Sequence, residues 1–166
     1  MNIKIIVTGG TFDKDYDVVN GGLSFKETNL HEMLKTGRCT QDIDIETVLL
    51  KDSLDLTEND RKKIVERCRR ARQDRIIITH GTDTMVETAR ILAQKVSGKT
   101  IVLTGAMVPI RFARSDGLFN LGCSLAFVQL LPHGVYISMN GNYYEWNNVV
   151  KNKQMGRFEE IRPIAR

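Results

Sequence analysis

Residues 76–84, IIITHGTDT, decide the fold of this chain. Three consecutive isoleucines predict a buried strand, which stops abruptly at small, hydroxylic and acidic residues. Apolar residues at helical spacing follow from Met85 to Val96, so the stretch reads as a strand that runs through a short loop into a helix. In a parallel sheet such loops lie at the carboxyl ends of the strands, where helix N-termini offer unpaired N–H groups. A polar substrate is expected there.

Two other stretches repeat this pattern. An apolar run at residues 5–7 leads into Thr8-Gly9-Gly10-Thr11, and another at residues 101–103 leads into Thr104-Gly105-Ala106. Glycine at such a position lets the backbone amides approach a ligand with no Cβ in the way. A tight turn would explain any one of these loops equally well. Three of them at one edge of a sheet favour a ligand site.

The rest of the chain predicts an α/β fold. Strands are expected at residues 3–7, 43–50, 100–104 and 134–139. They alternate with helices, of which one begins near residue 28 and three others cover 58–70, 85–96 and 117–131. We therefore expect a three-layer α/β/α arrangement with a mainly parallel sheet, in a single domain spanning 1–166. Asp116 is expected to cap the last helix.

Two segments fall outside this alternation of strands and helices. Residues 12–27 are rich in Asp, Gly and Asn and predict a long connecting loop of the kind that is often functional. Asn140-Gly141-Asn142 predicts a C-terminal β-hairpin, whose second arm is expected over residues 143–150.

Composition narrows the classes of function. Cys39, Cys68 and Cys123 are odd in number and far apart, with no zinc-binding spacing, which indicates a reduced, cytoplasmic protein with no metal site. No apolar run approaches the roughly 20 residues that span a bilayer, and no signal-peptide pattern opens the chain, so no membrane partner is expected. The net charge is +4, and the arginines between residues 67 and 75 suit a solvated helix end better than a nucleic-acid surface. The sequence contains neither a Walker lysine nor a GxGxxG motif, so no cofactor is predicted.

Three motifs together resemble the bacterial-type L-asparaginase family. They are residues 8–11 (TGGT), residues 80–84 (HGTDT), and residues 103–107 (LTGAM) with Ser115-Asp116-Gly117, and their order and rough spacing also agree with the family. The resemblance covers the family's N-terminal domain, while the smaller C-terminal domain of typical members has no counterpart in this sequence. It implies an amidohydrolase without a cofactor.

The resemblance also implies roles for individual residues. Thr11 would be the nucleophile, and Thr82, Asp83 and Lys151 would form a second polar group, with Lys153 as the alternative lysine. Tyr16 is the candidate for the tyrosine of a lid formed by the loop at 12–27, although no residue matches that tyrosine by spacing. The expected substrate-binding residues are Gly10, Ser53, Gly81, Thr82, Asp83 and Ala106.

Ser53, Asp83 and His80 differ in their expected roles. By resemblance to the family Ser53 would hold the substrate's α-carboxylate, but Leu54 stands where that family commonly has glutamine and cannot donate a hydrogen bond. Asp83 should stay ionised and bind the substrate's ammonium group. His80 lies at the end of a strand, and we expect it to be structural rather than a catalytic base.

Two functions therefore remain open. One is hydrolysis of L-asparagine to L-aspartate and ammonia, and the other is a non-catalytic asparagine- or aspartate-binding or regulatory domain. The partner in either case is a small amino-acid amide or acid. The apolar helix with Leu118, Leu121, Leu125, Phe127, Val128 and Leu131, together with Tyr143, Tyr144 and Trp146, predicts a homodimer or higher homo-oligomer, against the alternative of a monomer that buries this helix in its own core.

Overall fold

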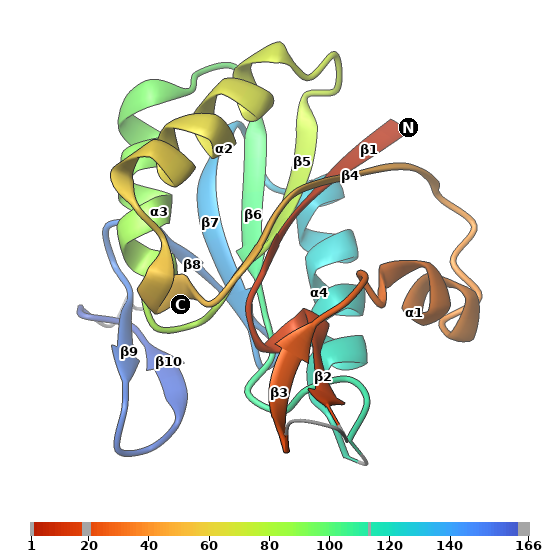
Figure 1. Ribbon diagram of the computed structural model, residues 1–166. Helices are drawn as coiled ribbons and strands as arrows, with labels where there is room; N and C mark the ends of the chain where they lie inside the picture. The colour runs from red at the N-terminus through yellow and green to blue at the C-terminus, as the bar shows by residue number, and fades with distance from the viewer. Residues whose placement is uncertain (1, 18–20, 113, 163–166) are drawn as a thin grey trace.

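The computed structural model describes residues 2–17, 21–112 and 114–162, and its centre is a six-stranded sheet (Figure 1). The strands lie in the order β4 (Asp42–Lys51), β1 (Asn2–Gly9), β5 (Arg75–Thr79), β6 (Thr100–Thr104), β7 (Gly134–Met139) and β8 (Asn142–Glu145). Neighbouring strands pair in parallel from β4 to β7, and β8 is antiparallel to β7. The mainly parallel sheet expected from the sequence is confirmed.

The strand order creates a switch point between β1 and β5. From β1 the chain goes to β4 on one side, and it then returns past β1 to reach β5 on the other. Parallel pairing of Ile6 with Ile78 and of Val7 with Thr79 brings the carboxyl ends of β1 and β5 level. Ligand sites in open α/β sheets form where connections diverge in this way. The geometry thus singles out the loops that follow these two strands.

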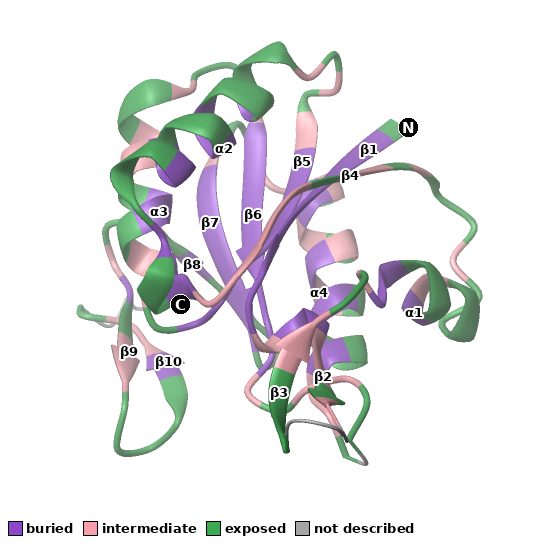
Figure 2. Cartoon of the chain, in the orientation of Figure 1, coloured by how far each residue is buried: buried purple, intermediate pink, exposed green. Residues whose placement is uncertain are grey.

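Helices cover both faces of the sheet, as the three-layer prediction requires. On one face lie α2 (Glu58–Arg70) and α3 (Met85–Lys95), and on the other lie α1 (Leu30–Thr36) and α4 (Gly117–Leu130). Because side chains alternate along a strand, Ile76 and Ile78 pack with the α2 and α3 side while Ile77 packs with the α1 and α4 side. Figure 2 shows the buried strands between helices whose outer surfaces are exposed.

Local capping explains where α2 begins. The Thr57 side chain accepts a hydrogen bond from the Asp60 N–H, and the Asp60 carboxylate accepts one from the Thr57 N–H, which makes a complete capping box. The predicted bounds of this helix, 58–70, agree with the structure.

The predicted loop at 12–27 is wrong in part. Thr11–Asp13 forms a short 3-10 helix, η1, and β2 (Lys14–Asp17) then pairs antiparallel with β3 (Gly22–Phe25). Strands of four residues that lie apart from the main sheet carry too little alternation to be recognised in a segment rich in Asp and Gly. Residues 14–17 and 22–25 therefore form a paired arm rather than an irregular loop.

The C-terminal hairpin is confirmed at its turn and wrong in its length. Asn140 and Gly141 have φ of 53° and 85°, as the two central residues of a type I′ turn require, and β8 pairs with β7 across this turn. The second arm ends at Glu145 instead of residue 150, because the Asn148 N–H bonds to the Glu145 carbonyl and turns the chain. A second hairpin follows, of β9 (Val150–Asn152) and β10 (Arg157–Glu159). Figure 1 shows this hairpin and the β2–β3 arm at the same end of the sheet.

Candidate active site

Two glycines set the distance between the loops after β1 and β5. Gly10 has φ of 79°, and a Cβ built on it would lie within 3.0 Å of backbone atoms of Gly81. A Cβ on Gly81 would in turn lie 2.6 Å from Ser53 Cβ. Both positions therefore leave no room for a larger residue. This close packing places Thr11, which directly follows Gly10, beside the loop that carries Thr82 and Asp83.

A lysine from a distant part of the chain completes a polar group on this loop. Lys151 Nζ donates a hydrogen bond to Thr82 Oγ1 at 2.7 Å and another to Asp83 Oδ1 at 2.8 Å. The Lys151 side chain is 14% exposed and that of Asp83 is 36% exposed, so the pair lies at the rim of the interior. Lys153 is exposed, and the contact thus selects Lys151 as the lysine beside Thr82. The structure brings together Thr82, Asp83 and Lys151 as predicted.

Ser53 packs against the loop that carries Thr82 and Asp83. It begins the 3-10 helix η2 (Ser53–Asp55), and it is buried. Its Oγ accepts a hydrogen bond from the Thr84 N–H at 3.4 Å, and its carbonyl accepts one from Thr84 Oγ1 at 2.8 Å. The adjacent Leu54 side chain is exposed. Ser53 therefore shapes the loop after β5, and its role toward the substrate stays a prediction.

Two side chains, those of Asp116 and Asn120, shape the third loop, which follows β6. Asp116 occupies the N-cap position of α4, as expected, but its side chain makes no capping bond. Its carboxylate instead accepts hydrogen bonds from the Met107 and Val108 N–H groups at 3.0 Å. Asn120, which the sequence analysis missed, donates to the Gly105 carbonyl at 2.9 Å and to Asp116 Oδ2 at 2.9 Å. A helix side chain reaching back to a preceding loop leaves no motif in the sequence. The Asp116 and Asn120 side chains together hold the backbone around the buried Ala106.

Tyr16 is the predicted residue that the structure leaves apart. It lies on β2 with the side chain 49% exposed, and among the described residues no hydrogen bond joins it to Thr11. Its role in a lid stays a prediction. The β2–β3 arm is attached near the site through Lys14, which forms an ion pair with Asp52, the residue before Ser53.

Asp13, two residues after Thr11, is a functional candidate that the sequence did not single out. It is fully buried, and Oδ1 accepts hydrogen bonds from Thr28 Oγ1 at 2.9 Å and from the Asn29 N–H at 3.1 Å. Oδ2 has no partner in the described part of the chain. Burial raises the pKa of this carboxyl to about 6. Asp13 thus links η1 to the start of α1 through a group that is costly to ionise.

His80 is fully buried beneath the loop after β5. Nδ1 lies 2.7 Å from the Gly81 carbonyl oxygen and Nε2 lies 2.8 Å from Thr88 Oγ1. Burial lowers the pKa of the imidazole to about 4, so the side chain is neutral at physiological pH. Both ring nitrogens are already occupied, which favours the expected structural role over that of a base.

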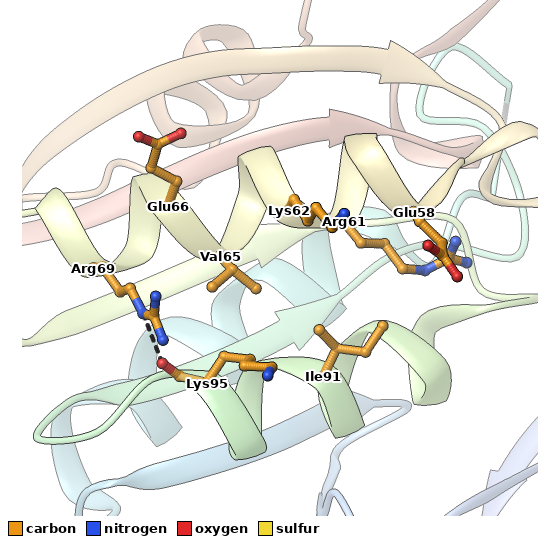
Figure 3. A pocket seen from close by; sticks show the side chains of 8 residues that line it. All are labelled: Glu58, Arg61, Lys62, Val65, Glu66, Arg69, Ile91 and Lys95. Atoms are coloured by element: carbon orange, nitrogen blue, oxygen red, sulfur yellow. Dashed lines mark hydrogen bonds between the residues drawn. The ribbon is translucent and has the colours of Figure 1, made fainter.

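Other features of the surface lie outside this group. A groove between α2 and α3 is lined by the side chains shown in Figure 3, which are Glu58, Arg61, Lys62, Val65, Glu66, Arg69, Ile91 and Lys95. Within residues 2–17, 21–112 and 114–162, no group of three His, Cys, Asp or Glu side chains is arranged to hold a metal ion. The helices in this part of the chain are also too short or too polar to cross a membrane.

Comparisons with known proteins agree on one family. The family described as asparaginase, N-terminal, matches residues 2–161. L-asparaginase 1 of Escherichia coli K12 is 31% identical over 160 residues, which are 90% of this chain and 47% of the relative. The solved thermostable L-asparaginase of Thermococcus kodakarensis superposes with a TM-score of 0.84 at 26% identity, over 97% of this chain and 51% of that one.

A structure called probable cytoplasmic L-asparaginase, from Campylobacter jejuni, superposes with a TM-score of 0.79 at 29% identity, over 90% of this chain and 49% of that one. The chain spans about half the length of these relatives. The match extends across β1, β5 and β6 and the three loops that follow them. The chain therefore belongs to the asparaginase family, in which it corresponds to the N-terminal domain.

Proposed function

We propose that this chain hydrolyses the side-chain amide of L-asparagine to give L-aspartate and ammonia, with Thr11 as the nucleophile and without a cofactor. The observation that carries the proposal is the contact of Lys151 with both Thr82 and Asp83, next to the loop that bears Thr11. Amide hydrolysis needs a nucleophile, a group that takes its proton, and donors that hold the developing oxyanion. The three loops, together with Lys151 on β9, supply a candidate for each.

Each residue has a distinct task in this proposal. Thr11 Oγ1 attacks the amide carbon, and ammonia leaves as the acyl-enzyme ester forms. Water then hydrolyses the ester and releases aspartate. Lys151 and Thr82 exchange a proton across their 2.7 Å hydrogen bond and so assist the proton transfers of both steps.

Asp83 binds the substrate's ammonium group. Its Oδ1 is held by Lys151, and the side chain is 36% exposed, so a ligand can reach the carboxylate from the solvent side. Gly10 and Gly81 contribute close-approaching backbone, and Ala106 contributes the backbone of the loop after β6. Ser53 contributes to the position of the α-carboxylate.

The test is ammonia release from L-asparagine, L-glutamine and short amides. We expect turnover of L-asparagine by the unmodified chain and none above background by Thr11→Ala. Thr36→Ala is the matched control, because Thr36 lies exposed at the end of α1, and it should behave as the unmodified chain. Unchanged turnover by Thr11→Ala would remove Thr11 as the nucleophile.

A non-catalytic asparagine- or aspartate-binding domain is the second candidate. It rests on the same three loops, and this chain spans about half the length of the relatives that carry the name L-asparaginase. Absence of ammonia release from every amide, combined with a melting temperature that rises with added asparagine or aspartate, would select this function.

Assembly and location also belong to the proposal. The surface of α4 exposes Leu118, Phe119 and Leu130, and Tyr143 of β8 is also exposed. We propose that these apolar residues meet a second copy of the chain in a homo-oligomer. Leu121 and Val128, by contrast, are buried in the chain's own core. The cytoplasm is the proposed location, in line with the name of the Campylobacter jejuni relative and with three unpaired cysteines.

A further inference from the structure

Three side chains form a continuous line of hydrogen bonds from α2 to the loop after β5. Arg61 Nε on α2 lies 3.2 Å from Thr88 Oγ1 on α3. Thr88 Oγ1 lies 2.8 Å from His80 Nε2, and His80 Nδ1 lies 2.7 Å from the Gly81 carbonyl oxygen. All three side chains are buried. The line ends one residue before Thr82.

The chemistry of these groups fixes the direction of every bond. A guanidinium nitrogen can only donate, so Thr88 Oγ1 accepts from Arg61. A carbonyl oxygen can only accept, so His80 Nδ1 carries the imidazole proton and donates it to Gly81. His80 Nε2 is then an acceptor, and the Thr88 hydroxyl donates to it. Each donor therefore has one acceptor, and the line runs from Arg61 to the Gly81 carbonyl.

The Gly81 carbonyl controls the orientation of the next peptide N–H. No cis peptide bond is present among the described residues, and in a trans peptide the C=O and N–H groups point in opposite directions. A Gly81 carbonyl held toward the buried imidazole therefore aims the Thr82 N–H away from the interior, toward the site. The same bond limits movement of Thr82 Oγ1, which meets Lys151.

We propose that Arg61, Thr88 and His80 act as a positioning relay, which holds the Gly81–Thr82 peptide in the orientation that presents Thr82 to the substrate. The relay rests on the proposed hydrolysis and adds to it three residues that do not touch the substrate. Arg61 is a suitable anchor because its guanidinium also donates to the Leu56 carbonyl and pairs with Glu87, at 2.8 and 2.9 Å. It thus ties α2, α3 and the segment after η2 to one point.

The test removes the central hydroxyl with little change of volume. Thr88→Val breaks the bonds to both Arg61 and His80, and we expect kcat for L-asparagine to fall about tenfold to a hundredfold with KM changed less than kcat, because misplaced catalytic groups lose rate at this scale. Thr88→Ser keeps the hydroxyl and should restore most of kcat. A kcat of Thr88→Val equal to that of the unmodified chain would overturn the relay.

Thr100→Val is the matched control for the general cost of losing a buried hydroxyl. Thr100 is also buried and also accepts from an arginine, since Arg75 Nη1 donates to its Oγ1, but it lies at the opposite end of β6. Its hydroxyl is within 3.0 Å of the Pro132 carbonyl oxygen. Thr100→Val should lose stability and keep kcat. An equal loss of kcat in both variants would show a general packing effect and overturn the relay.

NMR spectroscopy tests the relay without any assay of activity. The imidazole nitrogens of His80 should report a proton on Nδ1 in the unmodified chain, and the Thr82 amide signal should shift or broaden in Thr88→Val but not in Thr100→Val. A proton on Nε2, or an unaffected Thr82 amide in Thr88→Val, would overturn the relay. Should no amide be hydrolysed, the proposed function fails while these spectra still decide on the relay.

Discussion

Lys151 and Lys153 are two residues apart, yet they differ sharply in their surroundings. Lys151 contacts Thr82 and Asp83, and Lys153 is exposed. Lys151→Met keeps the length of the aliphatic chain and removes the amino group. We expect it to lower kcat by about 10²- to 10⁴-fold, the range typical of general acid–base groups. Lys153→Met should stay within about twofold of the unmodified chain by the same ammonia assay. Equal losses in the two variants would contradict the assignment.

Asp83 is expected to act on binding and on chemistry together. Asp83→Asn removes the charge that holds the substrate's ammonium group, and it also weakens the ion pair with Lys151. Steady-state kinetics should therefore show KM raised and kcat lowered. If neither constant changes, Asp83 has no part in the substrate site.

The site residues whose position in the loop after β5 was expected from the sequence share one property. Thr82, Asp83 and Gly81 stand in a short motif directly after a strand, so the topology of a parallel sheet is enough to locate them. The contacts of His80 with Thr88 and of Thr88 with Arg61 depend instead on how α3 and α2 dock on the sheet. Asn120 was missed for the same reason, since it acts on a loop 15 residues before it.

At the level of elements, the loops after β1 and β5 approach so closely that residue 10 must be a glycine. Gly10→Ala introduces a Cβ at φ of 79° and against backbone atoms of Gly81, and neither strain can relax by a side-chain rotation. We expect little or no activity. The free energy of unfolding should fall by more than the cost of strained backbone alone, which is about 1–3 kcal/mol.

Gly98→Ala separates the backbone strain from the contact of the added Cβ with its neighbours. Gly98 has φ of 69°, but a Cβ there meets nothing within 4 Å. This variant should lose only the cost of strained backbone, about 1–3 kcal/mol, and keep full activity. Urea unfolding of both variants measures the difference, and equal losses would mean that the contact with Gly81 has no energetic weight.

The elements that the sequence predicted are those of the main sheet and its long helices, because each spans enough residues for an apolar period to show. The β2–β3 arm and the β9–β10 hairpin have strands of three or four residues, too short for that signal. The consequence for function is direct, since β9 carries Lys151. The lysine itself was assigned by resemblance, and the strand that delivers it was not foreseen.

At the level of the whole molecule, assembly is tested on the exposed face of α4. Phe119 is 61% exposed and Leu130 is 80% exposed, so both can be changed without disturbing the core. We expect light scattering at micromolar concentration to give a multiple of 18.8 kDa for the unmodified chain and the monomer mass for Phe119→Glu combined with Leu130→Glu. A monomeric unmodified chain with full activity would refute the proposed oligomer.

The pH dependence of stability is set in the weakly acidic range by two buried groups with opposite effects. The pKa of His80 is lowered from 6.5 to about 4, so below pH 6.5 the unfolded chain takes up a proton that the folded chain refuses, and the free energy of unfolding falls as the pH drops. The pKa of Asp13 is raised from 3.8 to about 6, so the folded chain holds a proton that the unfolded chain releases, and the free energy of unfolding falls as the pH rises from 3.8 to 6.

Each shift corresponds to about 3 kcal/mol, and because the signs are opposite the two effects nearly cancel between pH 4 and 6. Carboxyls whose pKa is lowered, such as those of Asp52 and Asp60, change stability only at more acidic pH, below their ordinary value of 3.8. We therefore expect urea unfolding to give a nearly level profile over pH 4–6 for the unmodified chain.

Asp13→Asn should reveal the His80 contribution, because an amide does not titrate while its oxygen can still accept the bonds from Thr28 and Asn29. The free energy of unfolding of this variant should rise by about 3 kcal/mol from pH 4 to 6.5, and it should exceed that of the unmodified chain at pH 7, where an ionised Asp13 is costly. Asp55→Asn, at an exposed aspartate, serves as the control and should follow the level profile. Were Asp13→Asn to follow it too, the buried carboxyl next to the proposed nucleophile would titrate no differently in the folded and unfolded chains, and its unpaired Oδ2 would carry no energetic cost.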